Sequence, residues 1–241
     1  MQIRSILAAS AALFVAGSSV AHDGRRFEIK VVDDQLVAHG YISGVDPTDD
    51  GGGLIRPYYN AVHAHWEPGL TGATQTLPGF DLLDGADALD GYDVTYTLTG
   101  ASQWTPGGHG HGGIHLMPAE QTLGVAYDGV LLTTQTLGSH VLVQDWDGVV
   151  GSGSNGYDID LSYSIATAPT DVIYLIEGYL STDAPGIADS TTVYTILSPS
   201  GHGFHHASLS LEAFVGTDVP EPATLALMAI GGLVSLRRRV A

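Results

Sequence analysis

The sequence predicts an all-β protein, in which a single β-sandwich of jelly-roll type lies between two targeting segments. Short segments alternate between apolar and polar residues, and clusters of Gly, Asp, Asn and Pro separate them. No stretch of the body shows a convincing apolar stripe of helical period. A series of short strands divided by turns is typical of a sandwich, and the lack of an internal repeat disfavours propellers and solenoids.

Residues 1–21 have the layout of a secretory signal peptide. Arg4 supplies the early charge, residues 6–17 form an apolar run, and Ser19, Val20 and Ala21 make a cleavage site of small residues. We therefore expect the general secretion machinery to export the protein, which would then begin at His22. An amino-terminal histidine weakly resembles the copper brace of lytic polysaccharide monooxygenases, but a chance histidine at the cleavage point is the simpler interpretation.

Residues 22–218 are long enough for one substantial core, and we expect one domain there. The clearest strand is 158–165, in which Ile159, Leu161, Tyr163 and Ile165 alternate with polar residues. Asp33 and Asp34 are a candidate hairpin turn between two early strands. In chain order, the expected strands are 27–32, 35–42, 61–66, 92–98, 130–136, 140–144, 158–165, 172–180, 192–197 and 206–214.

Composition excludes several function classes. The chain has no cysteine, so disulfides, thiolate nucleophiles and Cys-ligated zinc or iron–sulfur clusters are ruled out. Its formal net charge is −18, which repels nucleic acid and favours cations and a hydrated matrix. Neither G-x-S-x-G nor H-E-x-x-H occurs, and no loop has the pattern of a phosphate cradle. We therefore expect a non-catalytic protein that does not bind nucleic acid.

Histidines are the candidate metal ligands, because imidazole is the remaining side chain suited to Zn²⁺ or Cu²⁺ in a chain without thiols. In a strand, residues two apart point to the same face, about 6.5–7 Å from each other, so His63 and His65 are the best pair. A Gly/His-rich loop can also be a plain solvated connector. Three groups among the 11 histidines are candidates: His63 and His65; His109, His111 and His115; and His202, His205 and His206.

Acidic residues are candidate ligands for a second kind of metal ion. Asp81, Asp84, Asp87, Asp90 and Asp93 follow one another at intervals of three residues, and carboxylates in loops suit Ca²⁺. The spacing does not fit an EF-hand loop, so a solvated acidic turn is the competing interpretation.

Tryptophans offer a candidate sugar-binding surface, because indole rings can stack on sugars. Trp66, Trp104 and Trp146 are nevertheless expected in the core, as is usual for tryptophans in a sandwich.

The last residues carry three features in a fixed order. Pro220, Glu221 and Pro222 precede an apolar run at 223–236, and Arg237, Arg238 and Arg239 follow it. The apolar run is shorter than the ~20 residues that span a bilayer, which indicates a transient anchor. The basic end would stay on the cytoplasmic side.

This tail, 219–241, resembles the PEP-CTERM sorting signal of Gram-negative bacteria. The resemblance implies recognition by a membrane-embedded exosortase, cleavage, and delivery to the cell envelope or an exopolysaccharide matrix.

Three functional hypotheses remain open from the sequence. The first is a non-catalytic surface or matrix protein, the second a His-rich envelope protein that binds or stores Zn or Cu, and the third a secreted metal-dependent enzyme. The first two are compatible with each other, and metal analysis of the purified protein separates them.

Overall fold

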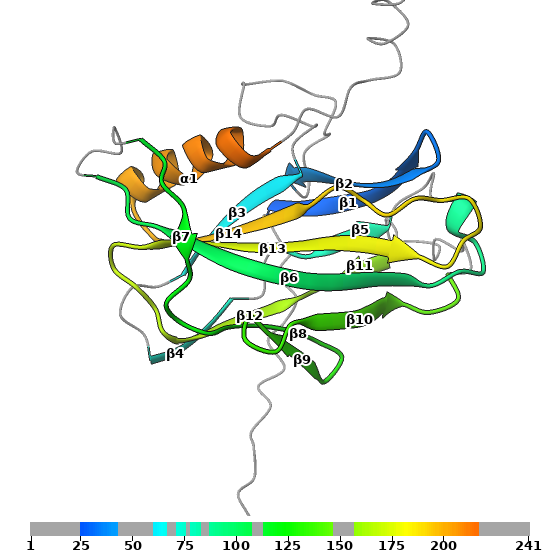
Figure 1. Ribbon diagram of the computed structural model, residues 1–241, viewed down its shortest axis with the longest axis horizontal. Helices are drawn as coiled ribbons and strands as arrows, with labels where there is room; N and C mark the ends of the chain where they lie inside the picture. Colours follow the sequence, from blue (N-terminus) through cyan, green and yellow to red (C-terminus); the bar gives the residue numbers. More distant parts are fainter. Residues whose placement is uncertain are drawn as a thin grey trace, which may run out of the picture.

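The computed structural model describes residues 25–42, 60–66, 71–75, 78–82, 87–107, 113–146 and 157–216. The expected signal peptide at 1–21, His22, His109, His111 and the tail at 219–241 lie outside these ranges. Within them, no helix is long and apolar enough to cross a membrane. The same residues confirm the all-β, sandwich-like class, since they form three β-sheets with one α-helix and one short 3-10 helix, η1 (Asp87–Leu89) (Figure 1).

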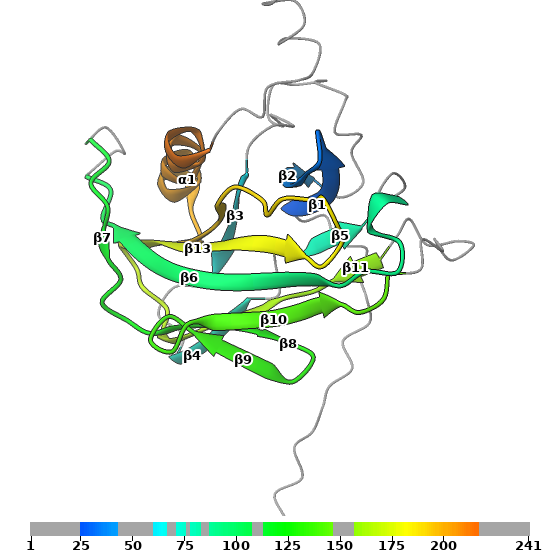
Figure 2. The ribbon, with the colours of Figure 1, turned by 45° about the vertical axis from the view of Figure 1, so that its right-hand side comes forward.

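The largest sheet occupies the middle of the molecule (Figure 2). Its pairings are antiparallel except for one, in which β3 lies parallel to β14 at the edge. In spatial order its strands are β10 (Gly138–Val143), β6 (Val94–Trp104), β13 (Ile173–Thr182), β14 (Val193–Pro199) and β3 (Ala61–Trp66), with β7 (Met117–Pro118) paired to β6.

Two four-stranded sheets complete the β structure. The first has the order β11 (Tyr157–Ile159), β5 (Phe80–Leu82), β1 (Arg25–Val32) and β2 (Gln35–Ile42), with β1 and β5 parallel. The second has the order β4 (Thr71–Gln75), β12 (Ser162–Thr167), β8 (Leu123–Tyr127) and β9 (Val130–Thr133). The two parallel pairs, β1/β5 and β3/β14, depart from the purely antiparallel order of a jelly roll.

The hairpin of β1 and β2 shows how local sequence sets the register. Val32 pairs with Gln35, so Asp33 and Asp34 form a two-residue turn, as predicted. Both residues have positive φ, 51° and 60°, which is the conformation of a type I′ turn. Because the turn fixes the register, the apolar side chains of both strands reach one common core.

Two apolar clusters lie on opposite faces of the six-stranded sheet. The larger one combines residues from all three sheets, including Trp66 and Trp146. The smaller one lies beneath the α-helix and includes Trp104, Ile196 and Leu211. All three tryptophans are at most 4% exposed, which confirms them as core residues. The six-stranded sheet is therefore covered on one face by the larger cluster, and on the other face by α1 over β3 and β14.

One predicted strand, 158–165, is interrupted at Asp160 and Leu161, so β11 and β12 belong to different sheets. The interruption lies beside Arg26, which is buried in β1. The guanidinium of Arg26 donates to Asp81 and to Asp160, each at 2.9 Å. Asp160 therefore contacts this charge while its own side chain stays 43% exposed. The contact also places Asp81, the first residue of the acidic series, in an ion pair.

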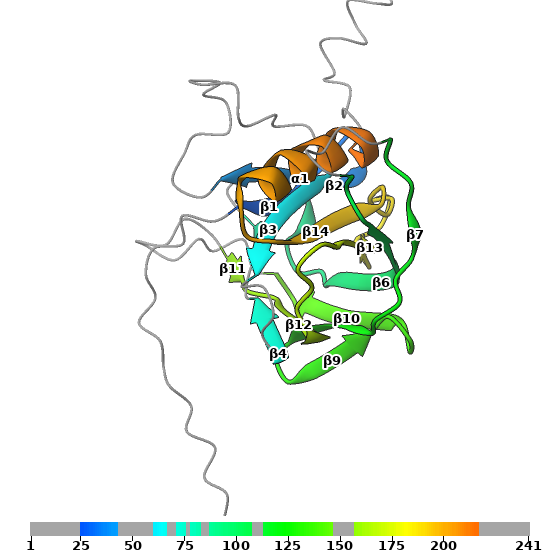
Figure 3. The same cartoon turned by 90° about the vertical axis from the view of Figure 1, so that its left-hand side faces the viewer.

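The strand predicted at 206–214 is wrong, because these residues lie in helix α1 (His202–Val215). Ala207, Leu209, Leu211 and Ala213 alternate in sequence, but only Ala207 and Leu211 are buried, four positions apart as helical packing requires. Phe204 and Val215 continue this apolar stripe against the sheet. Figure 3 shows α1 lying across β3 and β14, which its contacts confirm.

Candidate metal centre

Strand β3 presents two histidines to the space under α1. Ala61, His63 and His65 point to the helix side of the sheet, whereas Val62 and Trp66 point into the larger core. The predicted same-face arrangement of His63 and His65 is therefore present, with ring centroids 5.1 Å apart. His63 is only 4% exposed, and His65 is half-buried.

Helix α1 adds a third imidazole, that of His205. Its ring centroid lies 5.1 Å from that of His63 and 5.8 Å from that of His65. One ring nitrogen from each of the three lies within 4.8 Å of the others. His63 Nε2 and His205 Nδ1 are 3.2 Å apart. Two nitrogens bound to one tetrahedral Zn²⁺ lie about 3.3–3.4 Å apart, given Zn–N distances of about 2.0–2.1 Å. The separation of this pair already fits a shared ion.

Glu212, two helical turns after His205, orients His63. One carboxylate oxygen, Oε1, accepts the backbone N–H of His63 at 2.9 Å and contacts its Nδ1 at 2.6 Å. A carboxylate accepts hydrogen bonds, so Nδ1 carries a proton and Nε2 is the nitrogen that can coordinate a metal. This Nε2 is the atom directed at His205. Carboxylates that hold a ligating histidine in this way fix its tautomer and its ring orientation.

Ser198 holds the second strand histidine. Its hydroxyl lies 2.6 Å from His65 Nδ1 and accepts the hydroxyl of Ser208 on α1 at 3.0 Å. Because Ser198 stands opposite His65 in the parallel pairing of β14 with β3, the register of that pair positions the ring. Nε2 is then the nitrogen that His65 would offer to a metal, as for His63.

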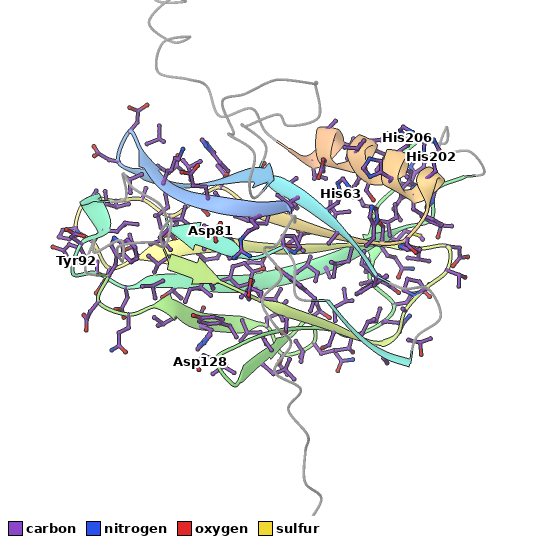
Figure 4. The ribbon with its side chains drawn as sticks, turned by 180° about the vertical axis from the view of Figure 1, so that it is seen from behind. His63, Asp81, Tyr92, Asp128, His202 and His206 are labelled. Carbon is purple, nitrogen blue, oxygen red and sulfur yellow. The ribbon has the colours of Figure 1, made fainter. Side chains whose placement is uncertain are left out.

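The other predicted ligands are distributed differently. His202 and His206 lie on α1 and are exposed, while His63 lies below them on the sheet (Figure 4). His115 is exposed and belongs to no metal-sized group among the described residues. The structure therefore unites the first predicted group with one member of the third, and does not bring His115 to them.

Sequence reasoning missed Glu212 and Ser198. Glu212 follows His205 by seven residues, so a helix would place both on one face, but the segment was interpreted as a strand. Ser198 carried no signal, since its role depends on a pairing between strands far apart in sequence.

Comparisons with known proteins identify the tail and leave the body unassigned. Residues 218–239 match the family model of the PEP-CTERM protein-sorting motif. This match confirms the resemblance seen in Pro220, Glu221 and Pro222, and indicates an exported protein that is directed to an exosortase and to the cell envelope or surface. No curated protein and no solved structure matches the chain.

Proposed function

We propose that this exported protein is a non-catalytic component of the cell envelope or extracellular matrix that binds Zn²⁺ or Cu²⁺. The observation that carries the proposal is the group of His63, His65 and His205, whose ligand nitrogens lie within 4.8 Å of one another. Imidazole is a preferred ligand for both metals, and the Glu212 carboxylate behind His63 is the kind of partner that strengthens such ligands. The net charge of −18 favours cation capture.

The sorting signal supports the location. In this proposal the protein is secreted by a Gram-negative-type bacterium and held transiently in the membrane by residues 223–236. An exosortase releases it, and it then contacts exopolysaccharide. Replacing Pro220, Glu221 and Pro222 with Ala in a host that has an exosortase should leave an uncleaved precursor in the membrane fraction. An unchanged mature mass and unchanged release would contradict this route.

Metal binding is tested on the purified full-length chain. Calorimetry with Zn²⁺ or Cu²⁺ should show saturable binding, and metal at about 100 times its Kd should stabilise the fold by about 2.7 kcal/mol, because it binds only the native state. Binding should weaken as the solution is acidified, because protons compete with the metal for the imidazole nitrogens.

The variant for this test is His65→Ala with His205→Ala, which keeps the contact between His63 and Glu212 that joins β3 to α1. It should lose most of the thermal shift. His115→Ala, at an exposed position outside the group, is the matched control and should keep the shift. A double variant that retains the full shift would refute the proposal.

A second candidate function follows from the number of ligands. Three imidazoles leave a fourth tetrahedral position for water, which is the composition of catalytic zinc sites. Hydrolysis of an activated ester by the zinc-loaded chain, abolished by the same double variant, would favour a metal-dependent enzyme. Metal loading without any turnover would favour binding alone.

A further inference from the structure

His202 and His206 form a second pair of imidazoles, outside the group under the helix. They are one turn apart on α1, and both are exposed. Their Nε2 atoms lie 3.1 Å apart, and the rings meet edge-on with centroids 4.4 Å apart. The same nitrogen of each ring therefore faces the other within hydrogen-bonding distance on the exposed side of the helix.

The distance between these nitrogens is the distance that a metal requires. With metal–nitrogen bonds of about 2.0–2.1 Å and angles between 90° and the tetrahedral value, two ligand nitrogens lie about 2.9–3.4 Å apart. His202 and His206 already meet this condition without any movement of the backbone. Their residue spacing of four places both side chains on one helix face.

The pair is separate from the group of His63, His65 and His205. Successive residues of a helix point about 100° apart, so His206 faces outward where His205 faces the sheet. The group of ligand nitrogens within 4.8 Å of one another comprises His63, His65 and His205, and it includes neither His202 nor His206. The outer pair therefore has no ligand in common with the inner group, although the rings of His205 and His206 touch, with centroids 5.9 Å apart.

The first turn of α1 has little else to stabilise it. Its N-cap residue, Gly201, makes no side-chain capping bond, and no acidic residue lies in the first turn. A metal held by His202 and His206 would clamp this turn, because the two residues begin and end it. The pair thus lies where a cross-link would have the largest effect on helix fraying.

We propose that His202 and His206 form a second, surface metal site for Cu²⁺ or Zn²⁺, with water completing the coordination sphere. The site has two protein ligands, so it binds more weakly than a site with three and exchanges its ion with the surroundings. Cu²⁺ binds tighter than Zn²⁺, following the general order of divalent affinities. The ion also holds the first turn of α1 closed.

The test uses the full-length chain carrying His65→Ala and His205→Ala, so that the result does not depend on the inner group. Equilibrium dialysis with Cu²⁺ alone should show a site that is lost, or weakened at least about tenfold, when His202→Ala and His206→Ala are added. Nitrogen couplings in the paramagnetic resonance spectrum should disappear with it. With Zn²⁺, hydrogen exchange at amides 205–208 should slow only while both histidines are present.

Two matched variants control this experiment. His115→Ala removes another exposed histidine and should change nothing. His202→Ala with Ser210→His moves the pair one turn along the same exposed face and should restore Cu²⁺ binding, because the spacing of four is kept. Unchanged binding after loss of His202 and His206, an equal loss in His115→Ala, or failure of the shifted pair to bind would each overturn the proposal.

Discussion

Replacing Glu212 tests how the helix is held on the sheet, independently of any metal. Its Oε1 accepts two donors of the buried His63, the backbone N–H at 2.9 Å and the ring Nδ1–H at 2.6 Å. In Glu212→Ala both donors lose this acceptor. A buried polar group deprived of its partner costs about 1–3 kcal/mol. The Glu212 side chain retains 12% exposure, so water relieves part of the penalty. We expect a loss of about 2–4 kcal/mol in the free energy of unfolding.

Glu212→Gln is the matched control, because its amide oxygen can still accept from His63. Only the charge of the acceptor is lost, so we expect a loss of about 1 kcal/mol. Urea unfolding of the metal-free chain at pH 7 measures both variants. If Glu212→Ala unfolds within about 0.5 kcal/mol of the wild type, or no more easily than Glu212→Gln, the proposed coupling between helix and sheet is wrong.

Two further predictions concern the sheets. Gly178→Ala should destabilise the fold by about 1–3 kcal/mol, because the added Cβ would overlap the buried ring of Tyr96. In the control, Gly100→Ala, the added Cβ meets no atom within 4 Å, so the stability should hardly change. Urea unfolding measures both variants. Burial of His39, with a smaller effect of Lys30, lowers its pKa to about 4 from 6.5. Between pH 6.5 and 4 the unfolded chain therefore binds more protons than the folded chain, so the free energy of unfolding falls as the pH drops through this range. In His39→Gln this decrease should be smaller, which unfolding measured at several pH values would show.

The sequence predicts those parts of the fold that depend on short-range patterns. Strands β2 and β3 have the predicted bounds, and the turn at Asp33 and Asp34 has the predicted geometry, because alternation and turn chemistry are local. Strands β4, β5, β7 and β8 were not predicted. β5 spans only three residues, and β8, with the sequence LGVAY, lacks clear alternation, so both depend on their neighbours for stability.

The candidate site likewise has one part that local sequence predicts and another that depends on contacts between distant segments. Alternation within one strand was enough to pair His63 with His65, but the addition of His205 and Glu212 required α1 to be recognised. The segment 206–214 carries apolar residues that satisfy both the two-residue and the four-residue period, and packing against the sheet selects the helix. An apolar stripe counted from Phe204 through Ala207 and Leu211 to Val215 would have indicated it.

The parallel pairing of β3 with β14 has a consequence for how the protein acquires its centre. His63 and His205 are 142 positions apart, and they meet only once the last strand and α1 have docked beside an early strand. Contacts between such distant segments form late, because closing a long loop costs entropy before it gains any contact. The three-imidazole group is thus completed by α1, the last described element before the sorting motif at residues 218–239. A chain in which α1 has not docked on β3 and β14 therefore lacks the group.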